Sequence, residues 1–158
     1  MFRIGFGNDV HRLVRGRPLV LGGVQVEFDL GLDGHSDADV LTHAVMDAVL
    51  GALGKGDIGR HFPDSDPAYL NADSLKMLIT VMEMARTEGF AVNNLDVTVV
   101  AQRPRLAPYM DRMREKLAKI LDVPAGRVNV KATTTEGLGY CGRGEAVEAF
   151  AVVSLIKE

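Results

Sequence analysis

Two short clusters of histidine and aspartate could bind a metal ion. Asp9 and His11 lie two positions apart near the N-terminus, and His43 lies in an apolar stretch further along the chain. In an extended segment, side chains two positions apart point to the same side. Two histidines and one carboxylate leave a fourth position open, as in a catalytic zinc site. The alternative is that Asp9 caps a turn and both histidines are core residues, because no compact motif such as H-E-x-x-H is present.

A third histidine, His35, stands eight residues before His43. On one continuous helix the two would be about 12 Å apart, so they could share a metal only if the loop folded back. We expect His35 to contact a substrate instead; the alternative is a loop histidine without a role. We assign no role to His61.

A polar cluster at residues 133–136 could bind phosphate. Its three threonine hydroxyls can donate hydrogen bonds to phosphate oxygens, and Glu136 suits Mg²⁺ that is held mainly by substrate phosphates. The next eight residues contain four glycines and Arg143, a composition that suits a phosphate-binding loop. The alternative is that β-branched residues simply continue a strand and Glu136 is solvated.

The sequence contains no motif for several other common nucleotide-binding sites or catalytic nucleophiles. It contains no phosphate-binding loop of the G-x-x-x-x-G-K-[ST] type, and Gly5 and Gly7 do not complete a dinucleotide-binding fingerprint. No serine occupies a G-x-S-x-G elbow. Cys141 lacks a recognisable base partner, so we expect it to be buried or idle.

Apolar periodicity predicts the elements that would position these residues. The first helix should begin near Ser36, Asp37 or Asp39, each able to cap it, and end at Gly54. The stretch 57–67 is predicted to be a long binding loop or lid. Strands are predicted at residues 2–6, 19–21, 24–28, 95–101, 128–132 and 146–156, and helices at 39–53, from Asp73 to Gly89, and from Pro108 onward.

Strands and helices do not strictly alternate, which favours an α+β fold. We expect one domain over residues 1–158, a two-layer sandwich with a mixed sheet and helices packed on one face. The helix from Asp73 to Gly89 and the strand 146–156 each carry apolar residues on two sides. We therefore expect a partner subunit to cover the other face of the sheet.

The composition and the N-terminal sequence indicate the cell compartment and exclude some classes of partner. Of 158 residues, 47% are hydrophobic and 25% charged, and the net charge of −3 gives no support for nucleic-acid binding. No apolar run approaches the ~20 residues of a membrane helix. A single cysteine and an N-terminus without a signal-peptide pattern predict a cytoplasmic protein with no membrane partner; the alternative is the mature form of an organelle protein.

Six short motifs in this order make the chain resemble the 2-C-methyl-D-erythritol 2,4-cyclodiphosphate synthases of the non-mevalonate isoprenoid pathway. Each motif alone is weak, but all six together are specific, and the resemblance extends from Arg3 to Lys157. The motifs are Asp9-Val10-His11, His35 to Asp39, Gly56 to Gly59, Phe62 to Asp66, Val130 to Glu136, and Gly142 to Glu145.

The resemblance implies roles for the residues already singled out. It implies that Asp9, His11 and His43 hold Zn²⁺, and that Glu136 holds Mg²⁺ or Mn²⁺ on the diphosphate. It implies that His35 and Thr134 hold the phosphates in the transition state. The implied substrate contacts are Ser36, Asp57, Ile58, Gly59, Phe62, Pro63, Asp64, Ser65, Asp66, Ala101, Gln102, Arg103, Pro104, Arg105, Leu106, Ala107, Thr133, Thr135, Tyr140 and Arg143.

The resemblance also implies a reaction and an assembly. The implied reaction converts 4-diphosphocytidyl-2-C-methyl-D-erythritol 2-phosphate into 2-C-methyl-D-erythritol 2,4-cyclodiphosphate and CMP, which makes the enzyme a phosphorus-oxygen lyase. The implied assembly is a homotrimer with active sites between subunits. The chain departs from the family pattern at Asn8, where we expect an aromatic residue, at Ala38, where we expect glycine, and at Arg105, where we expect lysine.

Two other functions fit parts of the pattern. A metal-dependent phosphohydrolase would use the same site to activate water and would release inorganic phosphate. A trimeric metabolite sensor would bind a nucleotide or an isoprenoid diphosphate in the subunit clefts without turnover.

Overall fold

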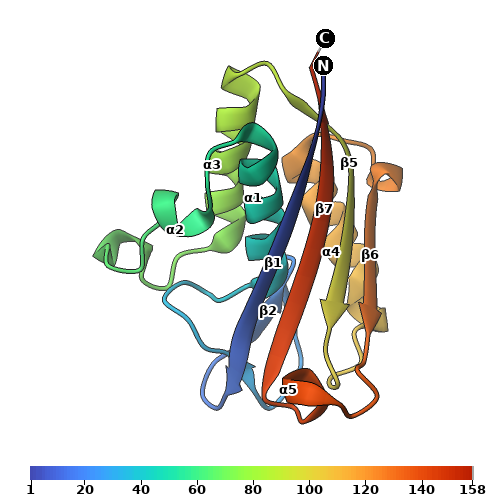
Figure 1. Cartoon of the computed structure of the whole chain (residues 1–158). Coiled ribbons are helices and arrows are strands. Elements are labelled where there is room, and N and C mark those ends of the chain that lie inside the picture. Colours follow the sequence, from blue (N-terminus) through green and yellow to red (C-terminus); the bar gives the residue numbers. More distant parts are fainter. Residues whose placement is uncertain (158) are drawn as a thin grey trace.

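A five-stranded mixed sheet forms one layer of the protein, and the computed structural model describes residues 1–157 (Figure 1). The strand order is β4-β1-β7-β5-β6, in which only β5 and β6 pair in parallel. The termini lie side by side, because Phe2 pairs with Ile156. The strands are β1 (Phe2–Val14), β4 (Gly31–Leu32), β5 (Ala91–Val100), β6 (Val128–Thr133) and β7 (Ala146–Ile156), with a separate hairpin of β2 (Leu19–Leu21) and β3 (Val24–Val26).

The longer helices, α1, α3 and α4, form the second layer and cover one face of the sheet (Figure 1). α1 packs on β1 and β7, α3 packs beside α1, and α4 lies against β6. This arrangement confirms the predicted α+β sandwich. The helices are α1 (Val40–Leu53), α2 (Ile58–His61), α3 (Ser74–Thr87), α4 (Met110–Leu121) and α5 (Gly139–Gly142), with 3₁₀ turns at Pro67–Tyr69, Ala107–Tyr109 and Ala125–Arg127.

Two glycines let α1 lie directly on β1. A Cβ atom at Gly5 would lie 1.7 Å from the Ala48 carbonyl oxygen, and one at Gly7 would lie 1.9 Å from that of Ala44. No side chain larger than hydrogen fits between the two backbones at these points. The helix therefore approaches closely the face of β1 that also carries Asp9.

Asp39 fixes the beginning of α1. Its side chain is fully buried and accepts hydrogen bonds from the Thr42 amide at 3.0 Å and the Thr42 hydroxyl at 2.8 Å. The same carboxylate accepts bonds from the amides of Gly22 at 2.9 Å and Gly23 at 2.7 Å. Asp39, one of the three residues predicted as possible caps, thus also joins α1 to the turn between β2 and β3.

Three predicted elements differ from the structure. β1 continues to Val14 because it pairs with β7 as far as Arg12, so Asp9 and His11 lie within the strand rather than after it. Within the single chain, α3 is buried on one side only, and Ile79 on its other side is 42% exposed. The chain itself therefore does not cover both of the apolar sides that were predicted for this helix. The stretch 57–67 is not a loop throughout, since it contains α2.

The two faces of the sheet differ in burial. The β7 face that carries Val147 and Val153 is buried under the helices. The outer face is open and carries apolar side chains on β1 and β7; Phe6, for example, is 61% exposed. Within residues 1–157, no helix has the length and apolar character needed to cross a membrane. The exposed large apolar side chains on the outer face of β1 and β7 are Phe2, Ile4, Phe6, Val10, Val152 and Ile156.

Candidate active site

Asp9, His11 and His43 meet where β1 faces the beginning of α1. His11 Nε2 lies 2.9 Å from Asp9 Oδ2, and His43 Nδ1 lies 3.1 Å from the same oxygen. The two imidazole nitrogens are 3.3 Å apart. One ligand atom from each residue therefore falls within 4.8 Å of the other two, as the sequence predicted for a metal site.

The hydrogen bonds of His11 orient its ring for a metal. Its Nδ1 lies 2.7 Å from the carbonyl oxygen of Asp33, and a carbonyl can only accept a hydrogen bond. Nδ1 therefore carries a proton, and in the neutral ring Nε2 presents its lone pair to Asp9. A backbone carbonyl on the outer nitrogen is a frequent support for a histidine that binds zinc.

Asp9 and His11 each stabilise the charged form of the other. Burial raises the pKa of Asp9, but its hydrogen bonds to His11 and His43 outweigh burial and lower that pKa from 3.8 to about 2. Burial lowers the pKa of His11, but its bond to Asp9 outweighs burial and raises that pKa above 6.5. The cluster is thus built around an ionised carboxylate that attracts a cation, either a proton on His11 or a metal. Imidazole nitrogens and a carboxylate oxygen are the donors that zinc prefers, so these residues fit the ion.

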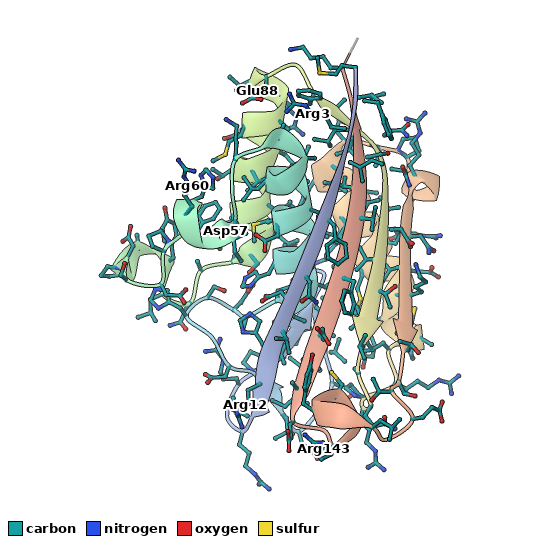
Figure 2. All side chains as sticks on the ribbon, viewed as in Figure 1. Arg3, Arg12, Asp57, Arg60, Glu88 and Arg143 are labelled. Carbon is teal, nitrogen blue, oxygen red and sulfur yellow. The ribbon has the colours of Figure 1, made fainter. Side chains whose placement is uncertain are left out.

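The ligand cluster forms one wall of a pocket that extends beneath α2. His35 and Ser36 line it beside the ligands, and the His35 Nε2 atom lies 3.0 Å from the carbonyl oxygen of Asp66. Ile58, Gly59, Phe62 and Asp64, four of the implied substrate contacts, also line this pocket. Asp57 caps α2 and lies beside this pocket without lining it, and Pro63, Ser65 and Asp66 belong to the loop that follows (Figure 2).

A second pocket forms where β5 and β6 end. Parallel strands bring their carboxyl ends to the same edge of a sheet, so residues 101–107 meet residues 132–134 there. Thr133 and Thr134 lie on one side of this pocket, and Gln102, Arg103 and Arg105 lie on the other. The structure therefore brings together two separate segments of the chain that contain implied substrate contacts.

The remaining predicted contacts lie outside both pockets. Thr135 and Glu136 are in the turn after β6, where Glu136 has a φ of +54°. Tyr140 donates a hydrogen bond to Glu148 at 2.6 Å, which raises the pKa of Tyr140 to about 12. Arg143 pairs with Glu145 at 3.1 Å and is well separated from Asp57 (Figure 2). Cys141 is buried, as expected.

Sequence reasoning missed several residues around the metal ligands. Gly34, Tyr69 and Met77 line the first pocket, and nothing in their local sequence singled them out. Asp47 was detectable, because it follows His43 by one helical turn and so lies on the same face of α1. Its carboxylate accepts a 2.8 Å bond from the Ile58 amide, which holds α2 onto α1, and burial raises the pKa of Asp47.

Known proteins share both the sequence and the fold. Residues 2–156 match the YgbB family. A 2-C-methyl-D-erythritol 2,4-cyclodiphosphate synthase from Geotalea daltonii is 61% identical over 153 residues, which cover 97% of this chain and 90% of that protein.

Two solved structures are similar over the whole chain. The bifunctional IspDF from Campylobacter jejuni matches with a TM-score of 0.96 and 43% identity, covering 100% of this chain and 43% of that one. A CDP complex of IspF from Plasmodium falciparum matches with a TM-score of 0.87 and 31% identity, covering 99% and 97% of the two chains. The chain belongs to the YgbB family, the family of the 2-C-methyl-D-erythritol 2,4-cyclodiphosphate synthases.

Proposed function

We propose that this chain, as a single domain, converts 4-diphosphocytidyl-2-C-methyl-D-erythritol 2-phosphate into 2-C-methyl-D-erythritol 2,4-cyclodiphosphate and CMP. The observation that carries this proposal is the convergence of Asp9, His11 and His43 in a pocket that His35 and Ser36 also line. The names of the relatives support the same reaction. The unpaired, buried Cys141 and the net charge of −3 fit a cytoplasmic enzyme that acts on a small molecule.

The proposed metals follow from the donor atoms. Two imidazole nitrogens and one carboxylate oxygen would hold Zn²⁺ at Asp9, His11 and His43, with a further position left for a substrate oxygen. Glu136 offers a single exposed carboxylate, which suits Mg²⁺ or Mn²⁺ held mainly by the diphosphate. When bound, these ions supply charge neutralisation and polarisation of the phosphates.

The reaction itself needs orientation more than proton transfer. An oxygen of the 2-phosphate forms a bond to the β-phosphorus, the bond from that phosphorus to the bridging oxygen breaks, and CMP leaves with this oxygen. The attacking oxygen is already an anion, so no protein base has to activate it. We assign His35 and Thr134 to hold the phosphate oxygens as charge develops, and both pockets to hold the two ends of one substrate.

The two pockets lie apart within a single chain. β1 carries the metal ligands, and β6 leads into Thr133 to Glu136, while β7 and β5 lie between them in the sheet. Three strand spacings separate β1 from β6 by about 14 Å. A second copy that places its β6 end beside the first copy's metal ligands would complete the site. We therefore propose a homotrimer with active sites between subunits, in which the open apolar face of the sheet is buried.

Identification of the product by ³¹P NMR tests this function. The purified protein would be incubated with the cytidine diphosphate substrate, Zn²⁺ and Mg²⁺. We expect CMP together with a cyclic product that shows two coupled phosphorus signals. Release of inorganic phosphate would instead indicate a phosphohydrolase, and bound but unchanged substrate would indicate a metabolite sensor.

A further inference from the structure

A buried hydroxyl from α3 contacts the far side of the His43 ring. Ser74, the first residue of α3, is fully buried, and its Oγ atom lies 2.9 Å from His43 Nε2. The opposite ring nitrogen, Nδ1, is the atom that faces Asp9. Ser74 is distant from the metal ligands in sequence and reaches them only because α3 packs beside α1.

Asp37 determines the direction of this hydrogen bond. Its carboxylate accepts one bond from the Ser74 amide at 3.0 Å and a second, short bond from the Ser74 hydroxyl. A serine hydroxyl has one proton, and a carboxylate can only accept. The Ser74 proton is therefore directed to Asp37, and the Ser74 oxygen must accept a bond from His43 Nε2.

We propose that Ser74 and Asp37 are positioning residues that keep a proton on Nε2 of His43, so that Nδ1 is the nitrogen left to bind the metal. The inference deepens the proposed function, because it rests on Asp9, His11 and His43 being the metal ligands. Ser36 Oγ also lies 3.1 Å from His43 Nε2, but it accepts a bond from the Ala38 amide and has no carboxylate partner that fixes its proton. Only the contact through Ser74 fixes the direction.

The geometry explains why the residues behind the His43 ring matter for metal binding. His11 obtains its orientation from a rigid carbonyl, that of Asp33, whereas His43 depends on a rotatable hydroxyl. A free hydroxyl could donate to Nε2 and so move the ring proton to Nδ1, where it would block the metal. The Asp37 carboxylate removes this possibility by taking the hydroxyl proton. Partners of this kind typically change metal affinity 10- to 100-fold.

Two measurements test the inference. The first is ¹⁵N NMR of the imidazole rings in the metal-free, unmodified protein, which we expect to show the His43 proton on Nε2. The second is Zn²⁺ affinity by chelator competition in Ser74→Ala, which we expect to be weaker by about 10- to 100-fold. Ser74→Thr keeps the hydroxyl and should restore most of this affinity.

Thr42→Val is the matched control. It removes another buried hydroxyl beside His43, one that bonds to Asp39 and not to the ring. We expect it to leave zinc affinity and the His43 proton position unchanged. A His43 Nε2 without a proton in the unmodified protein, or wild-type zinc affinity in Ser74→Ala, would overturn the inference. If the unmodified protein bound no zinc but kept its proton on Nε2, the proposed metal would be wrong and the orientation of His43 would stand.

Discussion

At the scale of single residues, the metal site is an arrangement of lone pairs. His11 and His43 each place one nitrogen within 3.1 Å of Asp9 Oδ2, and their outer nitrogens meet a carbonyl and serine hydroxyls. Acceptor atoms at such distances repel one another unless a cation or a proton lies between them. This repulsion is the physical reason to expect a bound metal in the working enzyme.

Without metal, the ion pair of Asp9 with His11 should stabilise the protein only within a window of pH. The lowered pKa of Asp9 contributes stability above pH 3.8 that is lost as the pH falls towards about 2. The raised pKa of His11 contributes stability below pH 6.5 that is lost as the pH rises through its folded value.

We therefore expect the difference in unfolding free energy between the metal-free wild type and Asp9→Asn to be largest between pH 3.8 and 6.5. Urea titrations of both proteins in the presence of a chelator would measure it. A difference that does not vary between pH 3 and 8 would contradict the assigned ion pair.

Ala38 illustrates a strained residue beside the site. It is fully buried with a φ of +57°, at the position where the family resemblance led us to expect glycine. Ala38→Gly should relieve about 1–2 kcal/mol of left-handed strain. It should lose a similar amount through the missing methyl group and the greater freedom of the unfolded chain.

We expect Ala38→Gly to change the free energy of unfolding by less than about 1 kcal/mol. Ala85→Gly, at a buried position inside α3, has no strain to relieve and should cost about 2 kcal/mol. Thermal and chemical unfolding of the two variants would compare them. Equal losses in both would show that Ala38 is not strained.

At the scale of elements, the site depends on how closely α1 approaches β1. Gly5, Gly7, Asp9 and His11 lie on the same face of β1, because they are two positions apart in a strand. The glycines allow the contact with α1, and the next two residues on that face, Asp9 and His11, form the candidate metal site together with His43. The spacing of one helix and one strand therefore sets the distances between the metal ligands.

Gly7→Ala should separate these two elements. The added methyl would lie 1.9 Å from the Ala44 carbonyl oxygen, so α1 must move, at a cost of about 3 kcal/mol. We expect lower unfolding stability and weaker zinc binding, measured by urea titration and chelator competition. Gly126→Ala is the control, since nothing lies within 4 Å of its Cβ, and it should leave both quantities unchanged. Wild-type zinc affinity in Gly7→Ala would contradict this view of the site.

Local sequence predicted α1 well but predicted β1 poorly. The helix begins after the Asp39 cap and ends at Gly54, because caps and apolar spacing are local signals. β1 continues past Phe6 only because β7 supplies its hydrogen bonds, which is a long-range effect that polar residues such as Asn8 conceal. The contact of Ser74 with His43 is also long-range. The sequence therefore predicted the residues of the candidate metal site but not the hydrogen bond that orients His43.

At the scale of the whole molecule, one chain presents two separate pockets and an open apolar area on the outer face of β1 and β7. Phe6 and Val152 pair on this face and are both exposed. Large exposed apolar patches on otherwise soluble folds commonly mark interfaces between subunits. The proposed trimer would account both for the two separate pockets and for the uncovered apolar area.

Val152→Glu should disrupt the trimer, because it would bury a charge in the proposed interface. We expect sedimentation as a single chain with native circular dichroism, and turnover lower by about 100-fold or more because the pockets of neighbouring chains separate. Ile79→Glu, on the exposed side of α3, should remain trimeric and active. A wild type that sediments as a single active chain would rule out the shared site.

The most direct test of the central claim is a zinc titration of the metal-free protein with turnover followed by ³¹P NMR. We predict that CMP and the cyclic diphosphate form in proportion to bound zinc and reach a plateau at one zinc ion per chain. His43→Ala should bind little zinc and turn over at least about 100-fold more slowly while keeping its fold. Full turnover by the metal-free protein, or by His43→Ala without bound zinc, would contradict the proposal that Asp9, His11 and His43 hold the catalytic metal.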